Sequence, residues 1–157
     1  MIRNVRIFFI TAASVIIADQ ATKAYIAARL WPNQVIEAVP GVFNIVYLKN
    51  PGAAFGILNE GGSLRRVILA GVSVAALAVI GFLVRESKDR LTSFSLSLIA
   101  GGAVGNLIDR VRFGEVVDFL DFHIGAYHWP AFNVADSAIT VGVILAAFSY
   151  YLKPRRA

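Results

Sequence analysis

Two long windows without any charged residue limit what this chain can fold into more than any other feature. They cover residues 67–84 and 91–108, which is 18 residues each. A helix of about 20 apolar residues crosses the hydrocarbon core of a bilayer. The whole chain is 57% hydrophobic and 16% charged, whereas soluble domains average about 45 to 50% and 25%. The two windows therefore predict two membrane-spanning helices.

Two further apolar runs lie near the ends of the chain, and both contain charged residues. With them we expect four transmembrane helices, at about residues 7–30, 67–84, 91–108 and 133–152. The first run resembles a secretory signal, but its internal charges favour a span that is not cleaved. We therefore predict an all-α integral membrane protein, with residues 1–157 as a single domain.

The two segments on the outer side, residues 31–66 and 109–132, are too long to be simple turns. The first contains two short runs rich in β-branched and aromatic residues, at 35–39 and 42–48, separated by Pro40-Gly41. This pattern predicts a hairpin. Residues 114–128 are expected to form a strand or a half-buried loop. The prediction is thus a small β-sheet and loop on the outer face.

The basic residues indicate how the chain is oriented. Three short segments, 1–6, 85–90 and 153–157, hold eight of the fifteen lysines and arginines, whereas the 60 residues of the two outer segments hold five. Because cytoplasmic segments are enriched in Lys and Arg, we place both termini in the cytoplasm. The cations form no basic run, which argues against nucleic acid as a partner. The absence of cysteine excludes disulfides, thiolate nucleophiles and iron–sulfur clusters.

Ionisable side chains inside a membrane span are functional candidates by default, because burying a charge there is costly. Counting along the helices places a layer of polar residues near the outer boundary: Asp19, Lys23, Asn106, Asp109, Arg110, Asn133 and Asp136. Asp19 and Lys23 are four residues apart, so they can pair on one helix face. Asp109 is adjacent to Arg110, which favours its ionised form.

Asp118 and Asp136 differ from these acids because neither has a cation close in sequence. Two such carboxylates held together can share one proton and activate water for amide hydrolysis. In the alternative interpretation, Asp118 and Asp121 face solvent and Asp136 caps the fourth helix.

Other residues carry weaker signals. His123 and His128 lack the helical spacing of a zinc peptidase, so no metal and no cofactor are predicted. The glycines at 101, 102 and 105 predict close helix packing.

Five sequence blocks, in order along the chain, resemble the bacterial lipoprotein signal peptidase family, signal peptidase II. The blocks are Asp19-Gln20-Ala21-Thr22-Lys23, Asn50-Pro51-Gly52-Ala53-Ala54-Phe55-Gly56, Gly101-Gly102-Ala103-Val104-Gly105-Asn106-Leu107-Ile108-Asp109-Arg110, Val116-Val117-Asp118-Phe119 and Pro130-Ala131-Phe132-Asn133-Val134-Ala135-Asp136. The resemblance implies an intramembrane aspartic endopeptidase of the bacterial inner membrane. Its substrates would be diacylglyceryl-modified prolipoproteins, cut just before the lipid-bearing cysteine near the outer leaflet.

The same resemblance implies a role for individual residues. Asp118 and Asp136 would be the catalytic pair, and Asp109 would support them. Substrate-binding or dyad-orienting groups would be Asn106, Arg110 and Asn133, and the residues that shape the site would be Asp19, Lys23, Asn50 and Gly52. Its partners would be prolipoproteins and membrane lipids, and a monomer suffices for the chemistry. The alternatives are a small transporter or proton-relay subunit and a non-catalytic membrane assembly factor.

Overall fold

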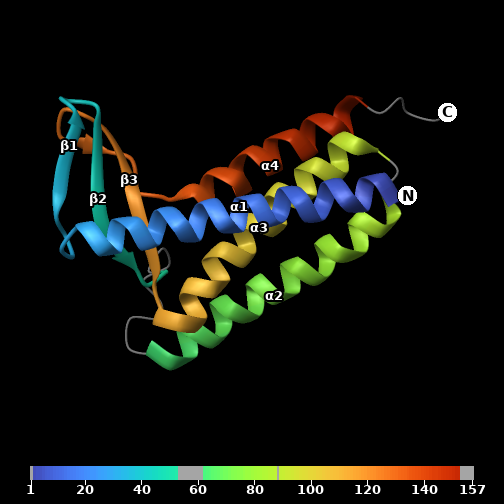
Figure 1. The fold of residues 1–157 in the computed structure, drawn as a ribbon, viewed down its shortest axis with the longest axis horizontal. Helices are drawn as coiled ribbons and strands as arrows, with labels where there is room; N and C mark the ends of the chain where they lie inside the picture. The colour runs from blue at the N-terminus through green and yellow to red at the C-terminus, as the bar shows by residue number, and fades with distance from the viewer. Residues whose placement is uncertain (1, 53–61, 88, 153–157) are drawn as a thin grey trace.

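Four long helices form the body of the molecule, and a small sheet lies at one end of it (Figure 1). The computed structural model describes residues 2–52, 62–87 and 89–152. The helices are α1 (Ile2–Arg29), α2 (Gly62–Glu86), α3 (Arg90–Phe113) and α4 (Val134–Leu152). Each contains a stretch long and apolar enough to cross a membrane. The predicted fold class is confirmed, and the chain is a multi-pass membrane protein.

The third helix extends further than its charge-free window predicts. It begins after the N-cap Asp89, whose carboxylate accepts a hydrogen bond from Thr92 N, and it ends at the left-handed C-cap Gly114. Asp109 and Arg110 are therefore helical and do not belong to an outer loop. The window stopped at Asp109 because a lone charge is costly in a span, but this carboxylate is paired with a lysine of α1.

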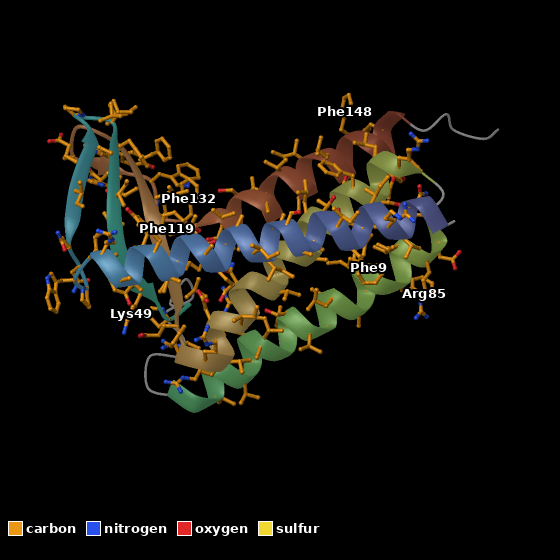
Figure 2. The ribbon with its side chains drawn as sticks, viewed as in Figure 1. Phe9, Lys49, Arg85, Phe119, Phe132 and Phe148 are labelled. Atoms are coloured by element: carbon orange, nitrogen blue, oxygen red, sulfur yellow. The ribbon has the colours of Figure 1, made fainter. Side chains whose placement is uncertain are left out.

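The sheet has four antiparallel strands in the order β1 (Val35–Val39), β2 (Phe43–Asn50), β3 (Val116–Ile124) and β4 (Tyr127–His128). The predicted hairpin is β1 and β2, and residues 114–128 supply β3 and β4. Figure 2 shows Lys49 and Phe119 at this end of the bundle and Arg85 at the other. The pairing of β2 with β3 sets Asn50 opposite Val116 and Leu48 opposite Asp118. It thereby brings the end of β2 to the start of β3.

Helix α3 lies at the centre of the bundle and packs against α1, α2 and α4. Its glycines make this close approach possible. A Cβ on Gly101 would lie 2.8 Å from Val15 Cβ of α1, and one on Gly102 would collide with the backbone of Ala135 in α4. A Cβ on Gly105 would lie 2.6 Å from Asp19 Oδ2. The prediction of close helix packing at these glycines is confirmed.

Replacing Gly105 by alanine is expected to lower the free energy of unfolding by about 1 to 3 kcal/mol, because the added methyl displaces a buried carboxylate. Gly81 of α2 is a matched control, since a Cβ there meets no atom within 4 Å. Gly81→Ala should leave stability unchanged or raise it by up to about 1 kcal/mol. Unfolding of both variants in detergent measures the difference, and equal shifts would show that the contact with Asp19 has no energetic weight.

Candidate active site

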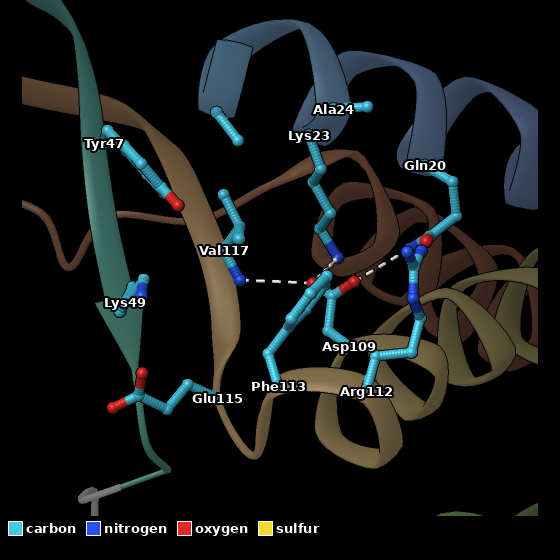
Figure 3. Close-up of a pocket in the computed structure, with 11 residues that line it drawn as sticks. Gln20, Lys23, Ala24, Tyr47, Lys49, Asp109, Arg112, Phe113, Glu115 and Val117 are labelled. Carbon is cyan, nitrogen blue, oxygen red and sulfur yellow. Dashed lines mark hydrogen bonds and ion pairs between the residues drawn. The ribbon is translucent and has the colours of Figure 1, made fainter. Parts of the chain in front are cut away.

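Lys23 is the only cation at the centre of the polar layer among the described residues, and it is fully bonded. Its ammonium forms ion pairs at 2.9 Å with both Asp19 and Asp109, and it donates a hydrogen bond of 3.0 Å to Asn106 Oδ1 (Figure 3 shows Lys23 and Asp109). The side chain is 4% exposed. An ammonium has three donors, so this lysine has none left for a substrate. The predicted pair between Asp19 and Lys23 is confirmed.

The two acids bound to Lys23 also join separate elements of the fold. Asp19 accepts a hydrogen bond of 3.0 Å from Ala135 N, in the first turn of α4. Asp109 accepts one of 3.1 Å from Val117 N, at the start of β3. Both are at most 1% exposed. The Lys23 cluster thus fixes α1, α3, α4 and β3 relative to one another.

Arg110 does not neutralise Asp109, as their adjacency in sequence had led us to expect. Neighbouring residues on a helix point in different directions and do not face each other. The cation bound to Asp109 is Lys23, and Arg110 forms no ion pair in the part of the chain that the structure describes. A role for Arg110 in binding substrate stays a prediction.

The remaining two acids of the site, Asp118 and Asp136, are bound by amides. Asn133 Nδ2 donates to Asp118 Oδ1 at 2.8 Å, and Asn50 Nδ2 donates to Asp118 Oδ2 at 2.9 Å. Asn106 Nδ2 donates to Asp136 Oδ1 at 2.8 Å. Asn133 bonds Asp136 through its backbone N, at 3.3 Å. One asparagine therefore contacts both carboxylates.

The first turn of α4 explains why Asn133 occupies this position. Asn133 Oδ1 accepts from Asp136 N at 2.9 Å, while Asp136 Oδ2 accepts from Asn133 N. This reciprocal pair is a capping box, which satisfies backbone donors that a helix start leaves free. The alternative interpretation of Asp136 as a helix cap is therefore correct for one of its oxygens. The other oxygen is turned to Asn106 and the site.

The pKa values of Asp118 and of Asp121, on the same strand, are shifted in opposite directions. Asp118 is 3% exposed, and burial, together with the negative charge of Asp136, raises its pKa from 3.8 to about 6. The hydrogen bonds from Asn50 and Asn133 oppose this rise. The interpretation that Asp118 faces solvent is wrong.

Asp121 is also buried, so the solvent-facing interpretation is wrong for this residue too. It is 8% exposed, and it binds Asn44 Nδ2 at 2.8 Å and His128 Nδ1 at 2.9 Å. Burial raises its pKa, but these hydrogen bonds outweigh burial and lower it overall. The His123 ring stacks on that of His128 at 4.7 Å between centroids. The two histidines thus belong to the packing of β3 on β4.

The position of Asn50 depends on a tight turn. Its Oδ1 accepts from Gly52 N at 2.8 Å, and Gly52 has a φ of +81°. A side chain at Gly52 would also collide with Leu69 of α2. Residues 53–56 of the same sequence block lie outside the described residues.

Gln20 is one member of the site that the sequence patterns did not predict. Its Nε2 lies 3.0 Å from Asp109 Oδ1, 3.1 Å from Gly105 O and 3.2 Å from Asp19 Oδ2. The available signal was an amide beside Asp19 inside an apolar helix. Such groups are costly unless they are hydrogen-bonded, so a partner on another helix could have been sought.

Comparisons with known proteins agree with this geometry. The family model described as signal peptidase (SPase) II matches residues 11–152. A lipoprotein signal peptidase of Geobacter metallireducens is 50% identical over 155 residues, covering 98% of this chain and 95% of that protein. One of Syntrophus aciditrophicus is 46% identical, covering 88% of each. The solved structure of a bacterial membrane enzyme has a TM-score of 0.84 at 34% identity, over 94% of each chain. These similarities confirm the resemblance seen in the sequence, and the chain belongs to the signal peptidase II family.

Proposed function

We propose that Asp118 and Asp136 are the catalytic pair of an aspartic endopeptidase that removes signal peptides from diacylglyceryl-modified prolipoproteins. The observation that carries this assignment is how the four acids of the site, three of them buried and Asp136 half-buried, are partnered. Asp19 and Asp109 share Lys23, whereas the side-chain donors on Asp118 and Asp136 are neutral amides. Two neighbouring carboxylates that bind no cation directly are the arrangement in which one proton can be shared.

The chemistry follows from one proton shared by two carboxylates. The ionised member accepts a proton from a water molecule, whose oxygen attacks the carbonyl carbon preceding the lipid-bearing cysteine. The protonated member donates to the developing oxyanion. When the C–N bond breaks, a proton passes to the leaving amine and the pair regains its starting state. Asn133 is hydrogen-bonded to both acids, and it fixes their relative position during these transfers.

The orientation of the chain in the membrane supports a lipid-anchored substrate for this pair. At the end of the bundle opposite the sheet, α2 ends and α3 begins with Arg90, and both termini lie there too (Figure 1). Figure 2 shows Arg85 at the same end. These cations support a cytoplasmic location for that end and for both termini. The dyad would then lie near the outer leaflet, where a diacylglyceryl group is anchored. We also infer that the sheet and the Asn50 turn hold the substrate in an extended form by main-chain hydrogen bonds. One copy of the chain supplies both acids, so a monomer suffices.

The test is cleavage of a synthetic prolipoprotein by the purified chain in detergent. We expect a diacylglyceryl peptide to be cut just before its cysteine, as read by mass spectrometry, and the same peptide without the lipid to stay intact. If the folded protein does not cleave the lipidated peptide, a transporter or an assembly factor would be favoured instead. The similarity to known peptidases does not favour either alternative.

The raised pKa of Asp118 predicts how cleavage depends on pH. Above its pKa of about 6, Asp118 loses its proton and can no longer serve as the proton donor of the pair. We therefore expect kcat/KM to fall as the pH rises through about 6. Asn50→Ala removes a hydrogen bond that lowers this pKa, so it should move the alkaline limb to higher pH.

Asn44 provides the control for this shift, because it donates to Asp121 just as Asn50 donates to Asp118. Asn44→Ala should leave the alkaline limb where it is in the wild type. If both variants shift the alkaline limb equally, or if neither shifts it, the pH dependence does not arise from Asp118.

A further inference from the structure

A cavity of about 270 Å³ lies beside the sheet, bounded by the last turns of α1 and α3, by β2 and by the start of β3 (Figure 3). Val117 of β3 lines it. Successive residues of a strand point to opposite faces, so Asp118 faces away from this cavity. Ligand pockets for drug-sized molecules occupy about 300 to 1,000 Å³. The cavity therefore suits a smaller group and is separate from the catalytic pair.

The floor of the cavity carries no free charge. Lys23 and Asp109 form it, and Lys23 uses all three of its donors within the cluster of Asp19, Asp109 and Asn106. Asp109 in turn accepts hydrogen bonds from Gln20 and from the backbone. A ligand would consequently be recognised by the other charged residues that line the cavity.

Three further charged side chains line the cavity, Lys49 of β2 and Glu115 on one side and Arg112 of α3 on the other (Figure 3). None of these three forms an ion pair with any described residue. The Arg112 guanidinium lies over the Phe113 ring, 4.9 Å from its centroid, which restricts where the cation can point. Two cations and one carboxylate complement a ligand that carries both an anion and a cation.

The depth of the cavity identifies the source of such a ligand. Ala27 and Arg112 line it, and they lie close to the ends of the spans that finish at Arg29 and Phe113. This level is the boundary between hydrocarbon and headgroups, where lipid phosphates lie. We propose that the cavity binds the phosphoethanolamine headgroup of a membrane lipid, with Lys49 and Arg112 at the phosphate and Glu115 at the ammonium.

The proposal is tested by calorimetric titration of the full chain in a neutral detergent. The probes are dihexanoyl phosphatidylethanolamine, phosphatidylcholine and phosphatidylglycerol. The ethanolamine lipid should bind about tenfold more tightly than the other two, because choline cannot donate to a carboxylate and glycerol carries no cation. Lys49→Gln and Arg112→Gln should each weaken it by about tenfold. Glu115→Gln should abolish the preference for ethanolamine.

Two controls separate this site from other forms of lipid binding. Arg85→Gln, at the opposite end of the bundle, should leave the affinity unchanged (Figure 2). Asp118→Asn should also bind normally, so a failure of the proposed catalytic pair does not affect this test. Each variant either replaces a side chain that forms no ion pair in the described chain or keeps the shape of the original side chain. Unfolding temperatures equal to that of the wild type, measured without lipid, verify that the variants fold.

Three results would overturn the proposal. Equal affinities for the three lipids would indicate partition into the detergent micelle. Affinities that Lys49→Gln and Arg112→Gln leave unchanged would place the lipid elsewhere. Soluble phosphoethanolamine should bind more weakly than the lipid because it lacks acyl chains, and equal affinity would identify a soluble ligand instead.

Discussion

Asp118→Asn and Asp136→Asn are each expected to lower kcat/KM for a diacylglyceryl prolipoprotein by about 10⁴-fold. An asparagine keeps the shape of the side chain but can neither accept a proton from water nor return one to the leaving group. The two losses should not add in the double variant, because the carboxylates act as one unit. Steady-state cleavage with matched amounts of folded protein measures all three.

Asp121→Asn is the control, because it changes another buried acid on the same strand that lies outside the catalytic pair. It should retain cleavage within about tenfold of the wild type, since no step of the hydrolysis uses its charge. Comparable losses in Asp121→Asn and Asp118→Asn would show that β3 needs buried charge for its structure, and would remove the evidence for a dyad.

The stability of Asp118→Asn provides a further test of the role of Asp118. The pKa of Asp118 is raised from 3.8 to about 6, so its ionised form opposes folding once the pH exceeds this window. The shift corresponds to roughly 3 kcal/mol at neutral pH, partly offset by the hydrogen bond that an amide loses. Asp118→Asn should therefore be at least as stable as the wild type at neutral pH while it is inactive. A large loss of stability would contradict this electrostatic assignment.

The largest effect on stability is expected from Lys23→Met, which should lower the free energy of unfolding by about 3 to 5 kcal/mol. The substitution leaves Asp19 and Asp109 as buried charges without a cation, at 0% and 1% exposure. It also removes one of the two hydrogen bonds that Asn106 Oδ1 accepts, and leaves the one from Asn133 Nδ2. Thermal or denaturant unfolding in detergent provides the measurement.

Lys49→Met is the matched control, because Lys49 is exposed and forms no ion pair among the described residues. Its effect should stay within about 0.5 kcal/mol. Adding Asp19→Asn and Asp109→Asn to Lys23→Met should restore much of the lost stability, since no buried charge is then left alone. If Lys23→Met is no worse than Lys49→Met, the cluster does not hold the bundle together.

Local patterns in the sequence were enough to predict the elements of this fold. Charge-free windows located the second and third spans because the hydrocarbon core excludes lone charges. The four-residue spacing of Asp19 and Lys23 predicted their ion pair, since both lie on one helix face. Two short runs rich in β-branched and aromatic residues on either side of Pro40-Gly41 predicted the hairpin. Each of these signals acts over a few residues, so no tertiary information was needed.

Contacts between distant segments could not be read in the same way. Adjacency suggested Arg110 as the partner of Asp109, but the partner is Lys23 on another helix. Asn50 and Asp118 are 68 positions apart and meet only because β2 pairs with β3. Gln20 gave a visible signal as a polar residue in an apolar helix, yet two of its three acceptors, Gly105 and Asp109, lie on α3.

Hydropathy and the placement of charges were enough to predict that this chain crosses a membrane, and five sequence blocks were enough to predict the signal peptidase II family. Which acids of the site meet a cation became evident only from the packed fold. Asp19 and Asp109 converge on one ammonium, while Asp118 and Asp136 converge on asparagines. The physical reason is that the charge state of a carboxylate depends on burial and on distances to its neighbours in space. Those distances exist only after the helices and the sheet have packed.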